Sequence, residues 1–274
     1  MARRDARRAA VVLLLTCEHG GNVVPRRYAG LFRGRSALLR SHRGWDPGAL
    51  VLAGVLSRRL RAPLLAASVT RLVVDLNRSP DHPAVFSAIT RGLPGVERNR
   101  IMARHYHPYR NRVAHAVANA HNTGNAVVHV GVHSFTPVLR GKRRRTDIGL
   151  LYDPSRVHER ALAERWRDAL GVAAPGLRVR MNDPYRGTSD GLTTTLRRAC
   201  PRVTYAGIEL EVNQRLVRGP AVRELFGVIA GALDAALVPP RRRVFSVRGR
   251  GGSSEPVIAS HTPRSRVLRR CTVS

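Results

Sequence analysis

Two histidines stand directly behind apolar runs that have the character of β-strands. His19 follows the run 11–15, and His133 follows the run 126–128. A strand that delivers a histidine into a turn places the imidazole at the edge of a sheet, where α/β proteins build their sites. Imidazole is the commonest metal ligand among side chains, and two imidazoles with one carboxylate would form an open zinc site. The competing interpretation is structural, because the chain contains eleven histidines.

Other residues that could do chemistry lie on or behind two further strand-like segments. Asn77 and Arg78 come after an apolar run, and Glu209 and Glu211 alternate with apolar residues along 208–212. Alternation places both glutamates on one face of a strand, so either could reach a site at its end. Metal ligands, an anion clamp and a general base are the parts of a zinc hydrolase. The alternative is a pair of solvent-facing glutamates on an edge strand.

The chain as a whole alternates between strand-like and helical patterns. Strands separated by helices predict an α/β fold with a mixed, mostly parallel sheet that helices cover on both faces. Asp46 followed by Pro47 is a favourable N-cap and first-turn pair for one of these helices. The predicted strands are 11–15, 126–132, 148–152, 178–181 and 205–212, the segments 64–67 and 73–76 are predicted as short strands or extended segments, and the predicted helices are 46–61, 104–121, 156–170 and 221–237.

The formal net charge of +30 raises the possibility of a polyanion-binding protein. Lys142 is the only lysine, so 47 of the 48 basic residues are arginine. A nucleic-acid-binding protein usually concentrates basic residues on one face and interleaves aromatic residues. Here arginine is spread over the chain and aromatic residues make up only 5%. We therefore rank a basic polyanion-binding protein without catalysis below an enzyme, although the run 142–145 and the segment 239–274 support it.

Cysteine usage and hydropathy favour a cytoplasmic protein. The three cysteines have no paired spacing, which argues against a disulfide framework. No stretch approaches the ~20 apolar residues of a membrane span, and the short apolar run behind the basic N-terminus is interpreted as a core strand rather than a signal peptide. Residues 1–238 are predicted to form one catalytic domain. Residues 239–274 hold nine arginines and one acidic residue and are predicted to be a disordered tail.

Eight ordered segments make the chain resemble the N-formylglutamate amidohydrolase family, which is similar in turn to the zinc carboxypeptidases. The resemblance spans residues 17 to 238. The matching segments are CEHGGNVVP (17–25), HRGWDPGAL (42–50), SVTRLVVDLNR (68–78), HPYRNRV (107–113), VHVGVHSFTPVL (128–139), RRTDIGLLYDP (144–154), VRMNDPYRGTSDG (179–191) and GIELEVNQ (207–214). The resemblance implies a zinc-carboxypeptidase-like fold, a zinc cofactor and hydrolysis of N-formyl-L-glutamate to formate and glutamate, as in histidine degradation.

The resemblance also implies the metal ligands. It assigns His19 and His133 as the imidazole ligands. The carboxypeptidase pattern has a glutamate three residues after the first histidine, where this chain has Asn22. Asp46 is our first choice for the carboxylate ligand, although it could serve only as an N-cap. Glu18 is second, because side chains of adjacent strand residues point to opposite faces unless the turn has begun at Glu18.

Substrate contacts follow from the same resemblance. The pair Asn77–Arg78 matches the pair that grips a terminal carboxylate, for which the planar guanidinium is well suited. Arg71 could hold the second carboxylate of a diacid. Tyr185 could cap the substrate, although a loop aromatic is more often a packing residue.

The expected base is Glu211, with Glu209 as the alternative on the same strand face.

The resemblance implies a small N-acyl amino acid as the binding partner, with no specific nucleic acid and no membrane. A related carboxypeptidase-like peptidase is the alternative enzyme. The sequence does not indicate an oligomeric state.

Overall fold

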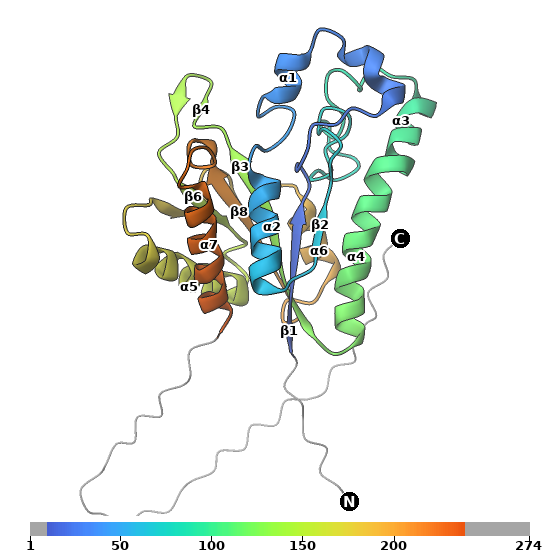
Figure 1. Cartoon of the computed structure of the whole chain (residues 1–274). Helices are drawn as coiled ribbons and strands as arrows, with labels where there is room; N and C mark the ends of the chain where they lie inside the picture. The colour runs from blue at the N-terminus through green and yellow to red at the C-terminus, as the bar shows by residue number, and fades with distance from the viewer. Residues whose placement is uncertain (1–9, 239–274) are drawn as a thin grey trace, which may run out of the picture.

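A six-stranded sheet forms the centre of the computed structural model, which describes residues 10–238 (Figure 1). The strands of the sheet are β1 (Val11–Cys17), β2 (Leu64–Ala66), β3 (Ala126–Phe135), β6 (Ile148–Leu151), β7 (Val179–Met181) and β8 (Tyr205–Asn213). Their order is β2-β1-β3-β8-β6-β7, and only the pair β6–β8 is antiparallel. The sheet is therefore mixed and mostly parallel, as predicted. A separate hairpin pairs β4 (Val138–Leu139) with β5 (Lys142–Arg143).

Helices cover both faces of the sheet. The longer ones are α2 (Ala49–Leu60), α4 (His107–Asn122), α5 (Val157–Ala173) and α7 (Val222–Leu237), and the shorter ones are α1 (Ser36–Arg40), α3 (Gly95–Ile101) and α6 (Leu192–Ala199). Helices α2, α5 and α7 pack together on one face, whereas α4 and α6 cover the other (Figure 1). Leu14 and Leu15 of β1 enter different cores, because adjacent strand side chains point to opposite faces.

Most predicted elements are confirmed, and three differences have physical causes. Residues 73–76 form a turn rather than a strand, and their apolar character reflects burial in the core on the α4 side. The helix predicted at 104–121 is preceded by α3 and a π-helical turn over Met102–Tyr106, so the chain is helical from Gly95 to Asn122. Helix α6 was not predicted, because its three threonines have low helix propensity.

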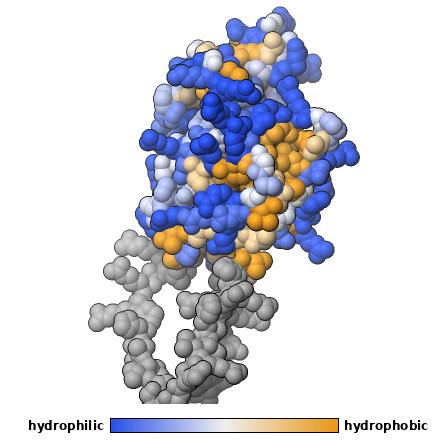
Figure 2. Space-filling view, turned by 90° about the vertical axis from the view of Figure 1, so that its left-hand side faces the viewer, coloured by the Kyte–Doolittle hydropathy of each residue, from blue (hydrophilic) through white to orange (hydrophobic). Residues whose placement is uncertain are grey.

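One side of the molecule is mainly hydrophilic. Figure 2 shows hydrophilic side chains over much of the side that faces left in Figure 1, with smaller groups of hydrophobic side chains between them. No helix within residues 10–238 is long and apolar enough to cross a membrane. The predicted tail at 239–274 lies outside the described residues.

Candidate metal centre and active site

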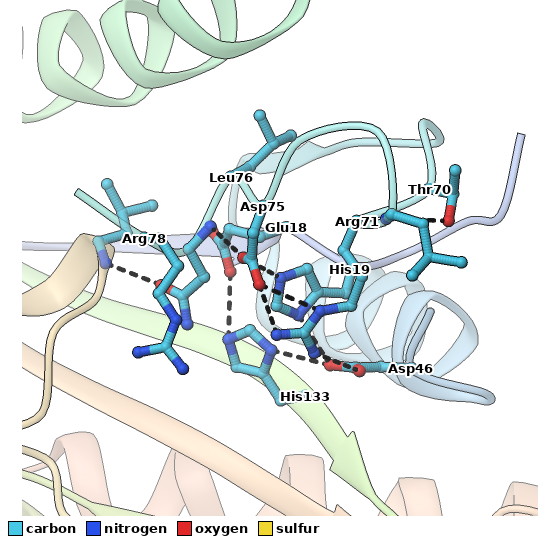
Figure 3. Close-up of polar contacts among 12 residues, drawn as sticks. Glu18, His19, Asp46, Thr70, Arg71, Asp75, Leu76, Arg78 and His133 are labelled. Carbon is cyan, nitrogen blue, oxygen red and sulfur yellow. Dashed lines mark hydrogen bonds and ion pairs between the residues drawn. The ribbon is translucent and has the colours of Figure 1, made fainter. Parts of the chain in front are cut away.

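His19, Asp46 and His133 converge at the end of the sheet where β1 and β3 end (Figure 3). His19 lies in the turn after β1, His133 near the end of β3, and Asp46 in the turn before α2. One ligand atom from each residue lies within 4.8 Å of the others, and all three side chains are buried. The structure therefore brings together the three residues that the sequence predicted as metal ligands.

Asp46 points into this cluster instead of capping the helix behind it. Helix α2 begins at Ala49, and its N-cap is Gly48 in a left-handed conformation (φ +81°). The expectation that Asp46 and Pro47 cap the helix is therefore wrong. Asp46 Oδ2 lies 3.3 Å from His19 Nδ1 and 3.0 Å from His133 Nδ1.

Backbone contacts fix the three segments against one another. The Asp46 N–H donates to the His19 carbonyl (2.9 Å), and the Ser134 hydroxyl donates to the Pro47 carbonyl (2.7 Å). A Cβ at Gly21 would lie only 2.5 Å from the carbonyl oxygen of Ser68, so the loop after His19 packs too closely for a larger residue. The Gly-Gly pair behind His19 is explained by this close approach.

A second carboxylate stands behind each histidine. His19 Nε2 lies 2.7 Å from Asp75 Oδ1. His133 Nε2 lies 3.2 Å from Glu18 Oε2, although this contact lacks the geometry of a hydrogen bond. Each ring thus directs Nδ1 toward Asp46 and Nε2 toward another carboxylate, which is typical of metal-binding histidines. Glu18 lies on the other side of the His133 ring from Asp46, so the geometry favours Asp46 as the carboxylate ligand (Figure 3).

The electrostatics of the cluster suit a cation. Burial by itself lowers the pKa of His133, but hydrogen bonding to Asp46 and the charge of Glu18 raise it well above its usual value. Burial by itself raises the pKa of Asp46, but the two histidines hold it well below its usual range. The site therefore stabilises positive charge where the three side chains meet. Two imidazoles and one carboxylate are also a donor set that Zn²⁺ accepts.

Tyr109 contacts Glu18 behind His133, and Tyr205 contacts a further buried histidine, His129; sequence reasoning did not predict either contact. The Tyr109 hydroxyl of α4 donates to Glu18 Oε1 (2.9 Å) and contacts the Leu65 carbonyl (3.0 Å). His129 of β3 lies between Thr16 Oγ1 (2.8 Å) and the Tyr205 hydroxyl (2.7 Å). The motif around Tyr109 was the available signal, but its contact with Glu18 depends on how α4 packs.

A cavity of about 260 Å³ opens beside the cluster. Glu209 and Glu211 both line it, as their shared strand face predicted. Glu211 lies opposite His133 in the β3–β8 pairing, and its Oε2 has no hydrogen-bond partner among residues 10–238. Burial raises the pKa of Glu211 to about 8. Glu209 instead accepts a hydrogen bond from the Thr193 hydroxyl (3.0 Å).

The predicted substrate-binding residues also line the cavity. Asn77 Oδ1 accepts a hydrogen bond from the Leu192 N–H (2.7 Å), and Arg78 Nη1 donates to the Asp190 carbonyl (3.2 Å). The Arg78 guanidinium makes no ion pair with Asp75, and Figure 3 places it beside the carboxylate network rather than in it. Tyr185 is 42% exposed at the cavity wall.

Arg71 occupies a different position from Arg78, because carboxylates already surround it. Its Nη2 lies 2.6 Å from Asp75 Oδ2, and its Nη1 lies 3.7 Å from Asp46 Oδ1 (Figure 3). Asp75 therefore joins Arg71 to His19.

Comparison with known proteins identifies the family. The family model of N-formylglutamate amidohydrolase matches residues 11–218. The crystal structure of a gene product of Agrobacterium tumefaciens is 33% identical, with a TM-score of 0.70, and the match covers 82% of this chain and 90% of that one. N-formylglutamate amidohydrolase from Ralstonia eutropha JMP134 shares the fold at 19% identity and a TM-score of 0.62, over 84% of this chain and 94% of that one. No curated protein sequence matches the chain. The chain belongs to the N-formylglutamate amidohydrolase family.

Proposed function

We propose that this protein is a zinc-dependent amidohydrolase that cleaves N-formyl-L-glutamate to formate and glutamate in the cytoplasm. The observation that carries the proposal is the convergence of His19, Asp46 and His133 in the wall of a cavity that also holds Glu211. Three protein ligands with an open position are typical of catalytic zinc, whereas structural zinc has four. Family membership supports amide hydrolysis and suggests the substrate.

The protein side chains then have separate tasks. A zinc ion held by His19, Asp46 and His133 would supply Lewis-acid polarisation of the formyl oxygen and lower the pKa of water. The charge of the bound zinc ion would offset the burial that raises the pKa of Glu211. The ionised Glu211 carboxylate then accepts a proton from the attacking water while the water oxygen bonds to the formyl carbon. The same carboxyl group then gives this proton to the amide nitrogen as the C–N bond breaks. The free Oε2 of Glu211 supports it over Glu209, whose Oε1 is bonded to Thr193.

Asn77 and Arg78 orient the substrate in this proposal. The Asn77 oxygen is occupied by the Leu192 N–H, which leaves the amide NH₂ as a donor. Arg78 uses one N–H on a backbone carbonyl and keeps further donors for a carboxylate. Together they would bind the α-carboxylate next to the scissile amide.

Hydrolysis and metal content test the proposal together. The purified protein is expected to release formate and glutamate in equal amounts from N-formyl-L-glutamate, and a chelator is expected to abolish this reaction until zinc is restored. Glu211→Gln should keep the metal and lose about 10²–10⁴-fold in rate, because a general base is removed. Unchanged hydrolysis in the metal-free protein would contradict the proposal. Full activity of Glu211→Gln with a dead Glu209→Gln would move the base to Glu209.

A further inference from the structure

Three arginines line the cavity, and they differ in how far the protein already neutralises them. Arg71 is paired with the carboxylates of Asp75 and Asp46. Arg78 donates to one backbone carbonyl. Arg186 also lines the cavity, and its guanidinium makes no hydrogen bond or ion pair with any of the residues 10–238 that the structure describes, whereas its backbone carbonyl accepts the Ser189 N–H (3.0 Å).

Arg71 is poorly placed to bind a substrate carboxylate. Its Nε and Nη2 both donate to Asp75 Oδ2, at 3.1 Å and 2.6 Å. The other oxygen of Asp75 bonds to His19 Nε2 (2.7 Å). A substrate carboxylate at Arg71 would compete with a buried partner that also orients His19. This arrangement favours a structural task for Arg71 beside the metal centre.

The neighbours of Arg186 on both sides are held in place, although its own guanidinium has no partner within residues 10–238. The Tyr185 hydroxyl accepts a hydrogen bond from Arg144 Nη1 (2.9 Å), and the Arg144 guanidinium lies 4.9 Å from the centre of the Tyr185 ring. The Gly187 N–H donates to Asn182 Oδ1 (2.9 Å). A Cβ at Gly187 would lie 2.1 Å from the backbone nitrogen of Tyr152, so the loop packs tightly on that segment.

We propose that Arg186 binds the side-chain carboxylate of a dianionic N-acyl amino acid, while Arg78 and Asn77 bind its α-carboxylate. The inference rests on the proposed function and adds the residue that would set its specificity. A free guanidinium on an anchored loop can form a bidentate pair with a carboxylate and lose little conformational entropy on binding. Arg78 and Arg186 come from different segments that line one cavity, so a diacid can engage both.

Selectivity between two substrates tests the assignment. N-formyl-L-glutamine has the shape of N-formyl-L-glutamate but lacks the side-chain charge. The wild-type protein is expected to prefer the glutamate substrate by about tenfold in kcat/KM, and Arg186→Gln is expected to remove this preference by slowing glutamate alone. Arg78→Gln should slow both substrates equally. Arg180→Gln changes an exposed arginine of β7 that does not line the cavity and should change neither rate.

Equilibrium binding separates this inference from the proposed function. In a Glu211→Gln background, binding of the same two compounds reports the preference without turnover. A glutamate preference that Arg186→Gln removes supports the inference even if no hydrolysis is found, in which case the proposed function alone fails. The inference is overturned if the wild-type protein hydrolyses both substrates equally, or if Arg186→Gln keeps the preference for the glutamate substrate. Either result leaves the proposed hydrolase function unaffected. If Arg71→Gln loses the preference for the glutamate substrate and Arg186→Gln keeps it, the side-chain carboxylate is bound by Arg71.

Discussion

Two clusters of charged side chains that are buried within residues 10–238 differ in how completely they are paired. In the first, around His19, Asp46 and His133, the side chains face a cavity, and His133 Nε2 has no hydrogen-bond partner within residues 10–238. In the second, Arg197 of α6 donates from Nε to both oxygens of Glu159 in α5, at 3.0 Å and 3.1 Å.

The second cluster uses nearly all of its hydrogen-bonding capacity. The two terminal nitrogens of Arg197 donate to the carbonyls of Gly187 and Gly207, and Glu159 also accepts the N–H groups of Gly207 and Asp153. It therefore ties α5, α6 and β8 to the loop that carries Tyr185 and Arg186. It does not line the cavity beside the metal ligands.

The difference between the clusters teaches how to tell a structural from a functional buried charge. Both contain charged groups away from water, which costs free energy unless partners compensate. Full internal pairing leaves nothing for a ligand to bind. Unpaired buried atoms beside a cavity mark a place where a ligand completes the coordination. We call the fully paired Arg197–Glu159 cluster the closed cluster and the His19–Asp46–His133 cluster the open cluster. Substitutions in the closed cluster should therefore change the stability of the fold, whereas substitutions in the open cluster should change ligand binding and reaction rate.

The largest expected effect is the loss of metal and activity in His133→Ala. Removing one imidazole breaks the three-ligand set, and loss of Lewis-acid catalysis should lower kcat/KM by about 10³-fold or more. Metal analysis and a hydrolysis assay measure both changes. Chelation of the wild-type protein gives the same loss with the chain intact, and His129→Gln, on the same strand but outside the ligand set, should keep its metal. Full metal content in His133→Ala would show that the open cluster is not the metal centre.

The next effect is a loss of stability in the closed cluster. Arg197→Met removes the closer of the two arginines that pair with the buried Glu159 and leaves only Arg156 Nε at 4.0 Å, which should lower the free energy of unfolding by about 3 kcal/mol. Urea denaturation measures the change, and the metal content of the folded fraction should not change. The double variant Arg197→Met/Glu159→Gln removes the unpaired charge and should recover part of the loss. A double variant less stable than Arg197→Met would mean that Glu159 does not depend on Arg197 for its pairing.

The sequence predicted the sheet and the convergence of His19, Asp46 and His133, because these follow from strand ends and ordered motifs. It did not predict what lies behind them. The pairing of Asp75 with His19 depends on a turn at 70–76, where the apolar pattern had indicated an extended segment. The direction of the Asp46 side chain depends on the left-handed Gly48, which delays the helix by two residues. Such contacts are set by tertiary packing, so a single sequence carries little signal for them.

The smallest predicted effect concerns His129, a third buried polar group that is closed like the Arg197 cluster. Burial lowers its pKa to about 4, while hydrogen bonds to Thr16 and Tyr205 occupy both ring nitrogens. The unfolded chain then binds a proton below its ordinary pKa of about 6.5, before the folded protein does.

Stability should consequently fall as the pH drops from about 6.5 to about 4, by up to about 3 kcal/mol from this residue, and should not fall further on its account below that. Denaturant unfolding of the wild type and of His129→Gln at several pH values measures the difference, because glutamine does not titrate. The gap between the two curves should shrink as the solution becomes acidic within this window. Parallel curves would show that the fold does not hold His129 neutral. His129 would then resemble the open cluster, not the closed one.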